Sequence, residues 1–371
     1  MSTIKHVAAR AGVSFTTVSH VLNGTRRVSD AARERVQQAI AEMGYAPSAV
    51  ARALRTSETC ILGVLVPNIT NPFFAELTRG IEDCCRRTDY SVFLCNSDDD
   101  PERQARYLQT LLERRVDGLL LAAAAGESPD LVRRLASAGV PAVVVDRNVP
   151  GLGADWVRVD HQAGARMAVE HLLALGHRAI ACLSGPSEFE VSRQRVAGWR
   201  EAMAGAGIET SPDWLLEGDF SAPAGHELAR RLLARGVITA IFASNDLLAI
   251  GALRAAAELG VAVPQSLSVI GFDGIDLGAY AFPALTSVGH PIRKMGEVAA
   301  ALLIERIAQK PAEAREVVLA PQLLMRESTR PMPAAPSCRH RSGRGRRWHR
   351  RWRSAWSTST SASAACTRMP T

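Results

Sequence analysis

The segment ILGVLVPNITNPFFAELTRGIEDCCRRTDYSVFLCN, residues 61–96, joins two short apolar runs through a stretch of helical periodicity. The runs cover 61–67 and 90–96, and the residues between them are enough for one amphipathic helix. A strand, a helix and a second strand in this order form a βαβ unit, whose strands are parallel. The segment therefore predicts a parallel sheet covered by helices.

Five further apolar runs repeat the pattern and extend the prediction to two lobes. They are VDGLLLA (116–122), VPAVVVD (140–146), RAIACLSG (178–185), AIFAS (240–244) and LSVIGFD (267–273). The runs fall into two sets, residues 61–160 and 161–289, and two such lobes form a cleft where the carboxyl ends of their strands converge. No GxGxxG or GxxxxGK[ST] motif follows a strand, which argues against a nucleotide-phosphate site.

Polar and aromatic residues follow these runs in NITNPFF, VDR, VSRQRVAGW, EGDF, SND and GFDG. One carboxylate, one guanidinium and a few amides framed by aromatic rings suit an uncharged polyhydroxylated ligand. Each residue also has a structural explanation: Asp246 or Asp273 can cap a helix, Phe73 can belong to the core, and Asn71-Pro72 can be a turn. Their shared position at strand ends favours a binding site.

The first 46 residues have a different texture, that of three short helices. Apolar residues at helical spacing surround Gly12, which predicts two helices joined by a turn. Ser14 is the expected N-cap of the second helix and Ser29 that of a third, which ends at Gly44. The outer face of the second helix carries Phe15, Thr16, Thr17, Ser19 and His20.

That outer face holds small polar side chains and one ring but no Glu or Lys. Such a face suits a helix that reads base edges in a major groove. An ordinary polar face of a three-helix scaffold explains the same pattern equally well. After Pro47, residues 49–54 predict a short helix in which Leu54 lies between Arg52 and Arg55; this is the composition of a minor-groove wedge, or simply of a helical linker.

The stretch IKHVAARAGVSFTTVSHVLNGTRRVSDAARERVQQAIAEMGYAPSAVARALRT, residues 4–56, resembles the head and hinge of the LacI/GalR family of bacterial transcription regulators. Within the family, the ribose and purine repressors are the most similar. The resemblance implies that Phe15, Thr16 and His20 read operator bases and that Leu54 is the wedge at the centre of a palindrome. It also implies DNA contacts from Ser14, Thr17, Ser19, Asn23 and Arg26. Phe15 stands where close relatives have Thr or Ser.

The resemblance continues to about residue 330 and implies an effector domain like the periplasmic sugar-binding proteins. Its motifs place ten residues at the effector: Asn71, Phe73, Phe74, Asp146, Arg147, Arg195, Phe220, Asn245, Asp273 and His290. Arg147 stands where the purine repressor has an aromatic residue, which favours a ribose-like sugar. His290 departs from the ribose pattern, which has Gln there, so another pentose or a hexose remains open. We expect no catalytic residue, metal or cofactor.

The expected architecture is α/β: a small all-α helix-turn-helix head plus a bilobed effector domain of two parallel-sheet, Rossmann-like subdomains. The expected boundaries are 1–46 for the head, 47–60 for the hinge helix and linker, 61–160 plus 291–320 for the first lobe and 161–290 plus 321–330 for the second. The family's helix after NPFF, here residues 73–86, packs against its two-fold mate. A palindromic operator also needs two reading heads, so we expect a homodimer.

The formal charge of +7 is unevenly distributed. Residues 331–371 hold nine Arg and no Lys, Asp or Glu, and three of the six Trp. We expect this tail to be disordered, and three interpretations stand: a basic arm that adds non-specific DNA affinity, an extension without function, and an out-of-frame reading of a GC-rich gene. Residues 1–60 carry eight basic and four acidic side chains, and residues 61–330 are net acidic.

The N-terminus lacks an apolar signal region, no run of 18 apolar residues exists, and the seven cysteines form no metal-ligand spacing. We therefore expect a cytoplasmic, nucleoid-associated protein with no membrane partner. Two other functions remain open: a sugar-binding transport protein, which shares the bilobed fold, and a sugar-processing enzyme that uses the cleft carboxylates. The basic head argues against the first, and the absence of a paired acid/base motif or nucleophile elbow argues against the second.

Overall fold

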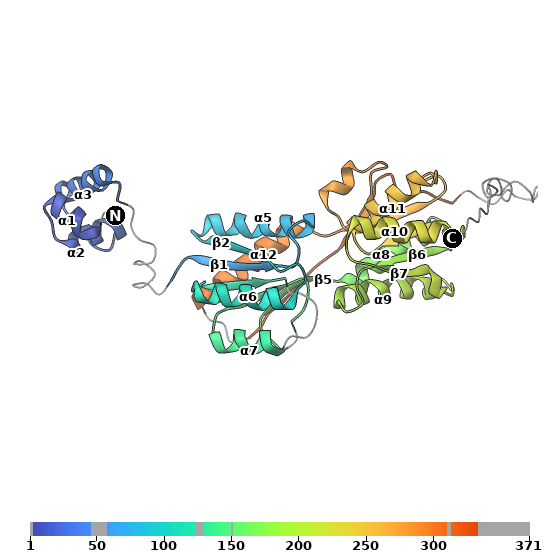
Figure 1. Ribbon diagram of the computed structural model, residues 1–371, viewed down its shortest axis with the longest axis horizontal. Coiled ribbons are helices and arrows are strands. Elements are labelled where there is room, and N and C mark those ends of the chain that lie inside the picture. Colours follow the sequence, from blue (N-terminus) through green and yellow to red (C-terminus); the bar gives the residue numbers. More distant parts are fainter. Residues whose placement is uncertain (1–2, 46–57, 123–128, 150, 310–312, 333–371) are drawn as a thin grey trace, which may run out of the picture. The chain divides into compact units, whose positions relative to one another are not determined.

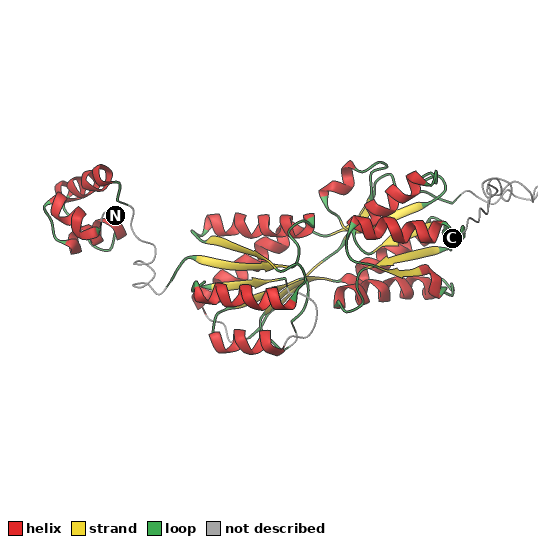
Figure 2. Ribbon diagram, viewed as in Figure 1, coloured by secondary structure: helices red, strands yellow, loops and turns green. Residues whose placement is uncertain are grey.

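The computed structural model describes residues 3–45, 58–122, 129–149, 151–309 and 313–332. They form a small helical head and two α/β lobes (Figures 1 and 2). The expected α/β class, with parallel sheets in both lobes, is confirmed. Within the described residues, no helix is both long and apolar enough to cross a bilayer.

The head consists of α1 (Ile4–Ala11), α2 (Phe15–Asn23) and α3 (Asp30–Met43) around a small core that includes Val7, Val18 and Val36. Gly12 adopts the left-handed conformation that ends α1 and turns the chain into α2. As expected, Ser14 caps α2: its hydroxyl accepts from the backbone N–H of Thr17 at 3.1 Å.

The expectation for Ser29 was only half right. Ser29 does precede α3 with an extended backbone, but its side chain makes no capping hydrogen bond. Ser29 therefore marks the start of α3 without capping it. Asp30 in the first turn supplies the negative charge that favours a helix N-terminus. The predicted short helix at 49–54, with Leu54, lies outside the described residues.

The first lobe is a six-stranded sheet in the order β2–β1–β3–β4–β5–β11, and every strand pair in it is parallel. Its strands are β1 (Ile61–Val66), β2 (Ser91–Asn96), β3 (Gly118–Leu121), β4 (Ala142–Val145), β5 (Asp155–Val159) and β11 (Glu316–Leu319). Its helices are α5 (Pro72–Arg87), α6 (Pro101–Glu113), α7 (Pro129–Ala138) and α12 (Ile292–Gln309).

The second lobe repeats this topology in the order β7–β6–β8–β9–β10–β12, with only β12 antiparallel. Its strands are β6 (Ile180–Ser184), β7 (Leu215–Glu217), β8 (Ala240–Ala243), β9 (Ser268–Asp273), β10 (Thr286–Gly289) and β12 (Gln322–Leu324). Its helices are α8 (His161–Ala174), α9 (Glu190–Gly205), α10 (Ala222–Leu233) and α11 (Asp246–Glu258), with short 3-10 helices η1 (Pro212–Trp214) and η2 (Asp276–Tyr280).

Both faces of each sheet are covered, which explains why the strands read as unbroken apolar runs. In β1, Leu62, Val64 and Val66 belong to the core beneath α5 and α12, whereas Leu65 belongs to the core beneath α6 and α7. Successive side chains of a strand point to opposite faces, so both cores draw on the same run. In the second lobe, α8 and α9 cover one face and α10 and α11 the other (Figure 1).

The chain passes between the two sheets three times: after β5, after β10 and after β11. In the first lobe β1 lies between β2 and β3, and in the second lobe β6 lies between β7 and β8. The winding direction changes at these strands, which leaves a crevice at their carboxyl ends. The expected effector residues lie in loops that leave the sheets at these ends or in the first turns of the helices that follow them.

Glycines let α5 and α12 cross with their backbones in contact. A Cβ at Gly80 would lie 1.9 Å from the carbonyl oxygen of Arg293, and one at Gly296 would lie 2.1 Å from that of Leu77. Because the obstacle is backbone in both cases, the helices would have to move apart to admit a methyl group. This contact fixes α12, which follows the second crossing, onto the first lobe.

We predict that Gly80→Ala lowers the free energy of unfolding by about 1–3 kcal/mol or more, because the helix pair cannot absorb the added methyl group. Gly205 ends α9 and has open space where its Cβ would stand. As the matched control, Gly205→Ala should be neutral or stabilising by up to about 1 kcal/mol. Urea denaturation of both variants checks this, and equal stabilities would contradict the close crossing.

Candidate functional site

A cavity lies where loops from both lobes meet, at the carboxyl ends of their strands. Among the described residues, Val191 and nine of the ten residues expected at the effector line it: Asn71, Phe73, Phe74, Asp146, Arg147, Arg195, Phe220, Asn245 and Asp273. Two segments of the first lobe and four of the second, which are spread over about 200 residues of sequence, are thus brought together.

The first lobe contributes the N-terminal end of α5. Asn71 caps this helix: its side-chain oxygen accepts from the backbone N–H of Phe73 at 3.1 Å. The ring of Phe74 stands edge-on to that of Phe73, with centroids 4.9 Å apart. Asn71 and Phe73 therefore have the structural roles that the turn and core explanations gave them, and both also line the cavity; their role in binding stays a prediction.

Asp146 and Asp273 come from equivalent positions in the two lobes, directly after β4 and at the end of β9. Both are buried and both have positive backbone φ, 63° for Asp146 and 101° for Asp273. Residues other than glycine rarely adopt this conformation, and such strain concentrates at functional sites. The strained backbone turns each carboxylate toward the cavity instead of letting it follow the strand.

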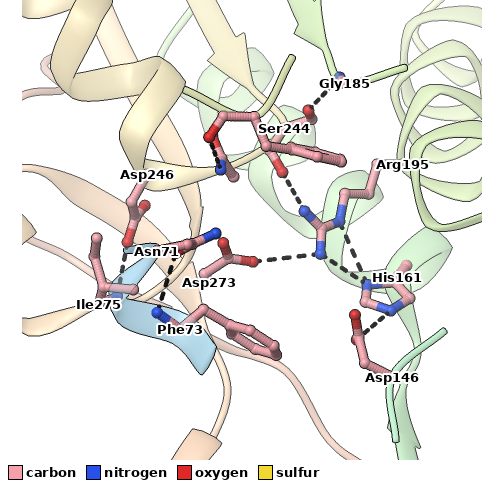
Figure 3. Close-up of polar contacts among 12 residues, drawn as sticks. Asn71, Phe73, Asp146, His161, Gly185, Arg195, Ser244, Asp246, Asp273 and Ile275 are labelled. Carbon is pink, nitrogen blue, oxygen red and sulfur yellow. Dashed lines mark hydrogen bonds and ion pairs between the residues drawn. The ribbon is translucent and has the colours of Figure 1, made fainter. Parts of the chain in front are cut away.

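Arg195 of α9 is the hub of the polar contacts at the cavity (Figure 3). Its guanidinium donates to the carbonyl oxygen of Ser244 at 2.5 Å and pairs with Asp273 at 3.3 Å. The same group lies over the ring of Phe272, 4.2 Å from its centroid. Although Arg195 is almost fully buried, its charge is matched by a carboxylate, a carbonyl dipole and an aromatic face.

His161 is a neighbour of this group that the sequence did not identify. It is the first residue of α8, it is 2% exposed, and it contacts both Asp146 and Arg195 (Figure 3). The available signal is its position just past the end of β5, where only Asp160 precedes it. The sequence of β5, DWVRV, alternates and is not an unbroken apolar run, so the pattern that predicts the other strands does not reveal it.

Three other cavity residues are held by neighbours that do not line the cavity or by the backbone. Phe220 packs over Gly185, where a Cβ would lie 2.2 Å from the ring. Arg147 forms an ion pair with Asp99 and stacks over the ring of Phe189 in the other lobe, 4.0 Å from its centroid. Asn245 caps α11 through the N–H of Leu248 and donates its amide hydrogen to the carbonyl oxygen of Phe220.

His290 is the one expected residue that does not line this cavity. Its ring is buried between Phe73 and Phe272, with centroid distances of 5.4 and 6.0 Å. Neither ring nitrogen has a hydrogen-bond partner among the described residues. Burial lowers the pKa of His290 to about 3, so the ring is neutral at pH 7.

The ionisation of the remaining groups leaves the cavity close to neutral overall. Burial acts to raise the pKa of Asp146, but His161 and Arg195 outweigh it and hold that pKa below its ordinary value. For Asp273, burial and the nearby carboxylates of Asp246 and Asp146 raise the pKa well above its ordinary value despite Arg195. The cavity is lined by two guanidinium groups, Arg147 and Arg195, and two carboxyl groups, Asp146 and Asp273. This balance suits an uncharged polar ligand better than an anion or a cation.

The cavity has a volume of about 30 Å³, which holds about two water molecules. Sites for small organic ligands usually enclose hundreds of Å³. Admission of a ligand therefore requires the lobes or their loops to separate. The three crossings between the sheets are the segments where such a motion can occur.

In the head, the residues expected at DNA gather on α2 and its two ends. Phe15, Thr16, Ser19, His20 and Asn23 share one side of the helix, while Val18 faces the core. Phe15 is 60% exposed, which is unusual for an aromatic ring in so small a head. His20 is held by a hydrogen bond between its Nδ1 and the hydroxyl of Thr25 at 2.8 Å, so Nε2 is the ring atom that can meet a base edge.

The other expected DNA contacts occupy the ends of α2. Ser14 and Thr17 hold each other through their hydroxyl groups, 2.9 Å apart, and Asn23 donates to the carbonyl oxygen of Ser19 at 2.5 Å. Arg26 is exposed in the loop that follows. Within the described residues, no group of three or more His, Cys, Asp or Glu side chains is arranged to hold a metal ion.

Two sequence profiles match the chain: one described as bacterial regulatory proteins, lacI family, over residues 3–48, and one described as periplasmic binding proteins and sugar binding domain of LacI family, over 59–328. The HTH-type transcriptional repressor PurR of Photobacterium profundum is 40% identical over 332 residues, 89% of this chain and 99% of its own. The ribose operon repressor of Escherichia coli K12 is 38% identical over 331 residues, 88% of this chain and 100% of its own.

Solved structures agree with these sequence matches. The lac repressor dimer bound to operator and the anti-inducer ONPF is 30% identical, with a TM-score of 0.80 over 89% of this chain and 99% of that one. A LacI family transcriptional regulator from Enterococcus faecium with bound ribose is 36% identical, with a TM-score of 0.68 over 74% of this chain and 100% of that one.

Proposed function

The chain belongs to the LacI family of bacterial regulatory proteins. The relatives it matches are DNA-binding repressors and not enzymes. We propose that a ribose-like sugar controls its binding to operator DNA. The observation that carries the proposal is the pairing of Arg195 with Asp273 in a buried cavity of near-neutral charge. A fork of guanidinium hydrogens beside carboxylate oxygens matches the adjacent hydroxyl groups of a sugar, and Phe74 and Phe220 offer faces for its C–H groups. The Enterococcus faecium relative with bound ribose supports the choice of a pentose.

The head binds the operator, and we propose that α2 enters the major groove with Phe15, Thr16 and His20 toward the bases. The short polar side chains around them allow the close backbone approach that base contacts require. Ser14, Thr17, Ser19, Asn23 and Arg26 then supply phosphate contacts, which fix the register of the helix on the duplex. Leu54 is proposed as the minor-groove wedge. Such a protein acts in the cytoplasm, on the nucleoid.

Gating follows from the two lobes and their three crossings. We propose that a sugar held by residues of both lobes changes the angle between them and thereby the separation of the two hinge segments in the dimer. A change in that separation favours or disfavours the segment around Leu54 in its DNA-bound form. Couplings of this kind are typically ~1–3 kcal/mol, or roughly 5- to 150-fold in operator affinity.

The dimer of this repressor family requires a surface on which two copies meet. The exposed aromatic rings at and after η2 fit this role: Tyr280 is 86% and Phe282 95% exposed. In the first lobe, the edge strand β2 leaves Phe93 and Leu94 nearly half exposed. Large exposed apolar side chains that lie close together in the chain, as Tyr280 and Phe282 do, are a feature of association surfaces. We propose that these residues, with the neighbouring α5, cover one another across the two-fold axis.

We predict that Tyr280→Ser together with Phe282→Ser weakens the dimer at least tenfold, because two large apolar side chains leave the proposed interface. Sedimentation equilibrium of the full chain measures the monomer–dimer constant. Leu259, another exposed apolar residue, lies at the end of α11, and Leu259→Ser serves as the control. If the dimer is unchanged by the double substitution, the interface lies elsewhere on the protein.

The effector proposal is tested by isothermal titration calorimetry of the full chain with ribose, other pentoses, hexoses and purine bases. We expect ribose or a close pentose to bind with micromolar affinity and purine bases not to bind. Binding of a purine base in place of every sugar would contradict the proposal.

A further inference from the structure

His161 contacts two effector-site residues that belong to different lobes. Its Nε2 lies 3.0 Å from Oδ1 of Asp146, at the end of β4 in the first lobe. Its Nδ1 lies 3.4 Å from Nε and 3.3 Å from Nη2 of Arg195, on α9 of the second lobe. Arg195 continues the chain of contacts to Asp273 at 3.3 Å. One ring therefore completes a polar chain from Asp146 to Asp273 (Figure 3).

The partners of the ring determine where its hydrogen lies. A guanidinium has only donors, so Nδ1 must be the acceptor in both contacts with Arg195. A neutral imidazole carries one hydrogen, which then resides on Nε2 and faces the carboxylate of Asp146. The Nε2–Oδ1 contact is short but falls outside hydrogen-bond geometry, so it acts as a close dipole–charge contact. The ring thus meets a cation with its lone pair and an anion with its hydrogen.

We call the contacts Asp146–His161–Arg195 the bridge, and the position of His161 in the chain explains why it crosses the lobe boundary. His161 begins α8 directly after Asp160, which caps that helix and follows the first crossing between the sheets. Its ring lies 5.9 Å from that of Phe272, the ring over which Arg195 also stacks. Side chains on both sides thus hold the ring in the boundary between the lobes.

We infer that His161 is a positioning residue of the effector site, which holds the Arg195 guanidinium and the Asp146 carboxylate in their sugar-binding orientations across the boundary between the lobes. The inference rests on the proposed function, since it concerns the sugar held by these two residues. His161 need not touch the sugar: it acts by preventing Arg195 from turning toward Asp146 directly, which would close the site with an ion pair.

The bridge also makes a prediction about pH. Burial lowers the pKa of His161 and so does Arg195, whereas Asp146 raises it, with a net shift below the ordinary 6.5. The other charged or titratable groups that act on the ring are Arg158 of β5 and His290 after β10. Protonation would place a hydrogen on Nδ1 against the guanidinium, so the affinity for sugar should fall as the pH drops below 6.5 through this lowered pKa.

Two substitutions of His161 separate its polar role from its space-filling role. In His161→Gln, the amide offers one donor and one acceptor at about the spacing of the ring nitrogens, so ribose affinity should stay within threefold of wild type. In His161→Phe, the ring volume remains but both polar contacts are lost, and affinity should fall 10- to 100-fold. His226, which pairs with Glu258 outside the cavity, gives the matched controls His226→Gln and His226→Phe, which should leave affinity unchanged.

Calorimetric titration of each full-length variant with ribose between pH 5 and 8 measures these effects. Any loss of wild-type affinity toward low pH should be smaller in His161→Gln. If His161→Phe binds ribose as wild type does, the inference is overturned while the proposed function stands. If wild type binds no sugar, the proposed function fails first, and the sugar-positioning role fails with it.

A readout that needs no sugar tests the bridge itself. Nitrogen-15 chemical shifts of labelled histidines, with the His161 signal identified by its loss in His161→Gln, report which ring nitrogen carries the hydrogen. We expect a neutral ring protonated at Nε2 at pH 7. A ring protonated at Nδ1, or charged at that pH, would overturn the inference whatever the ligand is.

Discussion

Arg195→Met should lower the affinity for the sugar effector by at least 100-fold while leaving effector-free operator binding within threefold of wild type. The guanidinium is buried and serves Ser244, His161 and Asp273 together, and methionine keeps most of the volume while it supplies none of these contacts. Removal of one partner of a buried ion pair typically costs about 3–5 kcal/mol, because the other partner stays buried without compensation.

Calorimetry for the sugar and fluorescence anisotropy for the operator measure the two affinities separately. Arg200 is exposed on the same helix α9, so Arg200→Met controls for the loss of a positive charge. A wild-type sugar affinity in Arg195→Met would place the effector elsewhere. Equal damage to sugar and operator binding would show that the variant has lost its fold and not its site.

His20→Ala should reduce specific operator affinity by roughly 30- to 20,000-fold and leave sugar affinity unchanged. A side chain that reads a base edge contributes about 1–3 kcal/mol of discrimination. In a dimer on a palindrome the substitution acts in both half-sites, which gives about 2–6 kcal/mol per complex. Because His20 is proposed to contact base edges and not phosphates, affinity for unrelated DNA and the salt dependence of binding should not change.

Anisotropy titrations with a duplex selected from a random library, and with a scrambled duplex, measure this specificity ratio. Gln38→Ala is the control within the head, since Gln38 is exposed on α3 and bonds only to Glu42 there. If His20→Ala keeps the wild-type preference for the selected duplex, α2 is not the reading helix in the way we propose.

The α/β class and the parallel sheets were predictable because buried strands in such sheets must be apolar on both faces. The same rule hides strands that are short or lie at sheet edges. β5, β7, β10, β11 and β12 were not among the seven apolar runs; β5 alternates buried and half-buried residues in DWVRV, and β7 has three residues. Of these, β7, β11 and β12 lie at sheet edges, where a strand buries one face or little of either and its composition approaches that of loops.

Most of the candidate site was predictable for a different reason: its residues stand in short motifs at strand ends. What the sequence could not supply was contact between motifs. His161 follows an unrecognised strand, Gly185 matters only because the ring of Phe220 lies over it, and the carbonyl of Ser244 receives Arg195 from another helix. His290 shows the reverse error: its position in the sequence placed it at the effector, but its ring packs against Phe73 and does not line the cavity.

The central claim, that a sugar between the lobes changes operator affinity, is tested by a single comparison on the full-length wild type. Operator affinity is measured by anisotropy without sugar and at a ribose concentration that calorimetry shows to be saturating. We predict a change of roughly 5- to 150-fold, and its sign distinguishes induction from corepression. The same operator affinity with the sugar bound as without it would contradict the account.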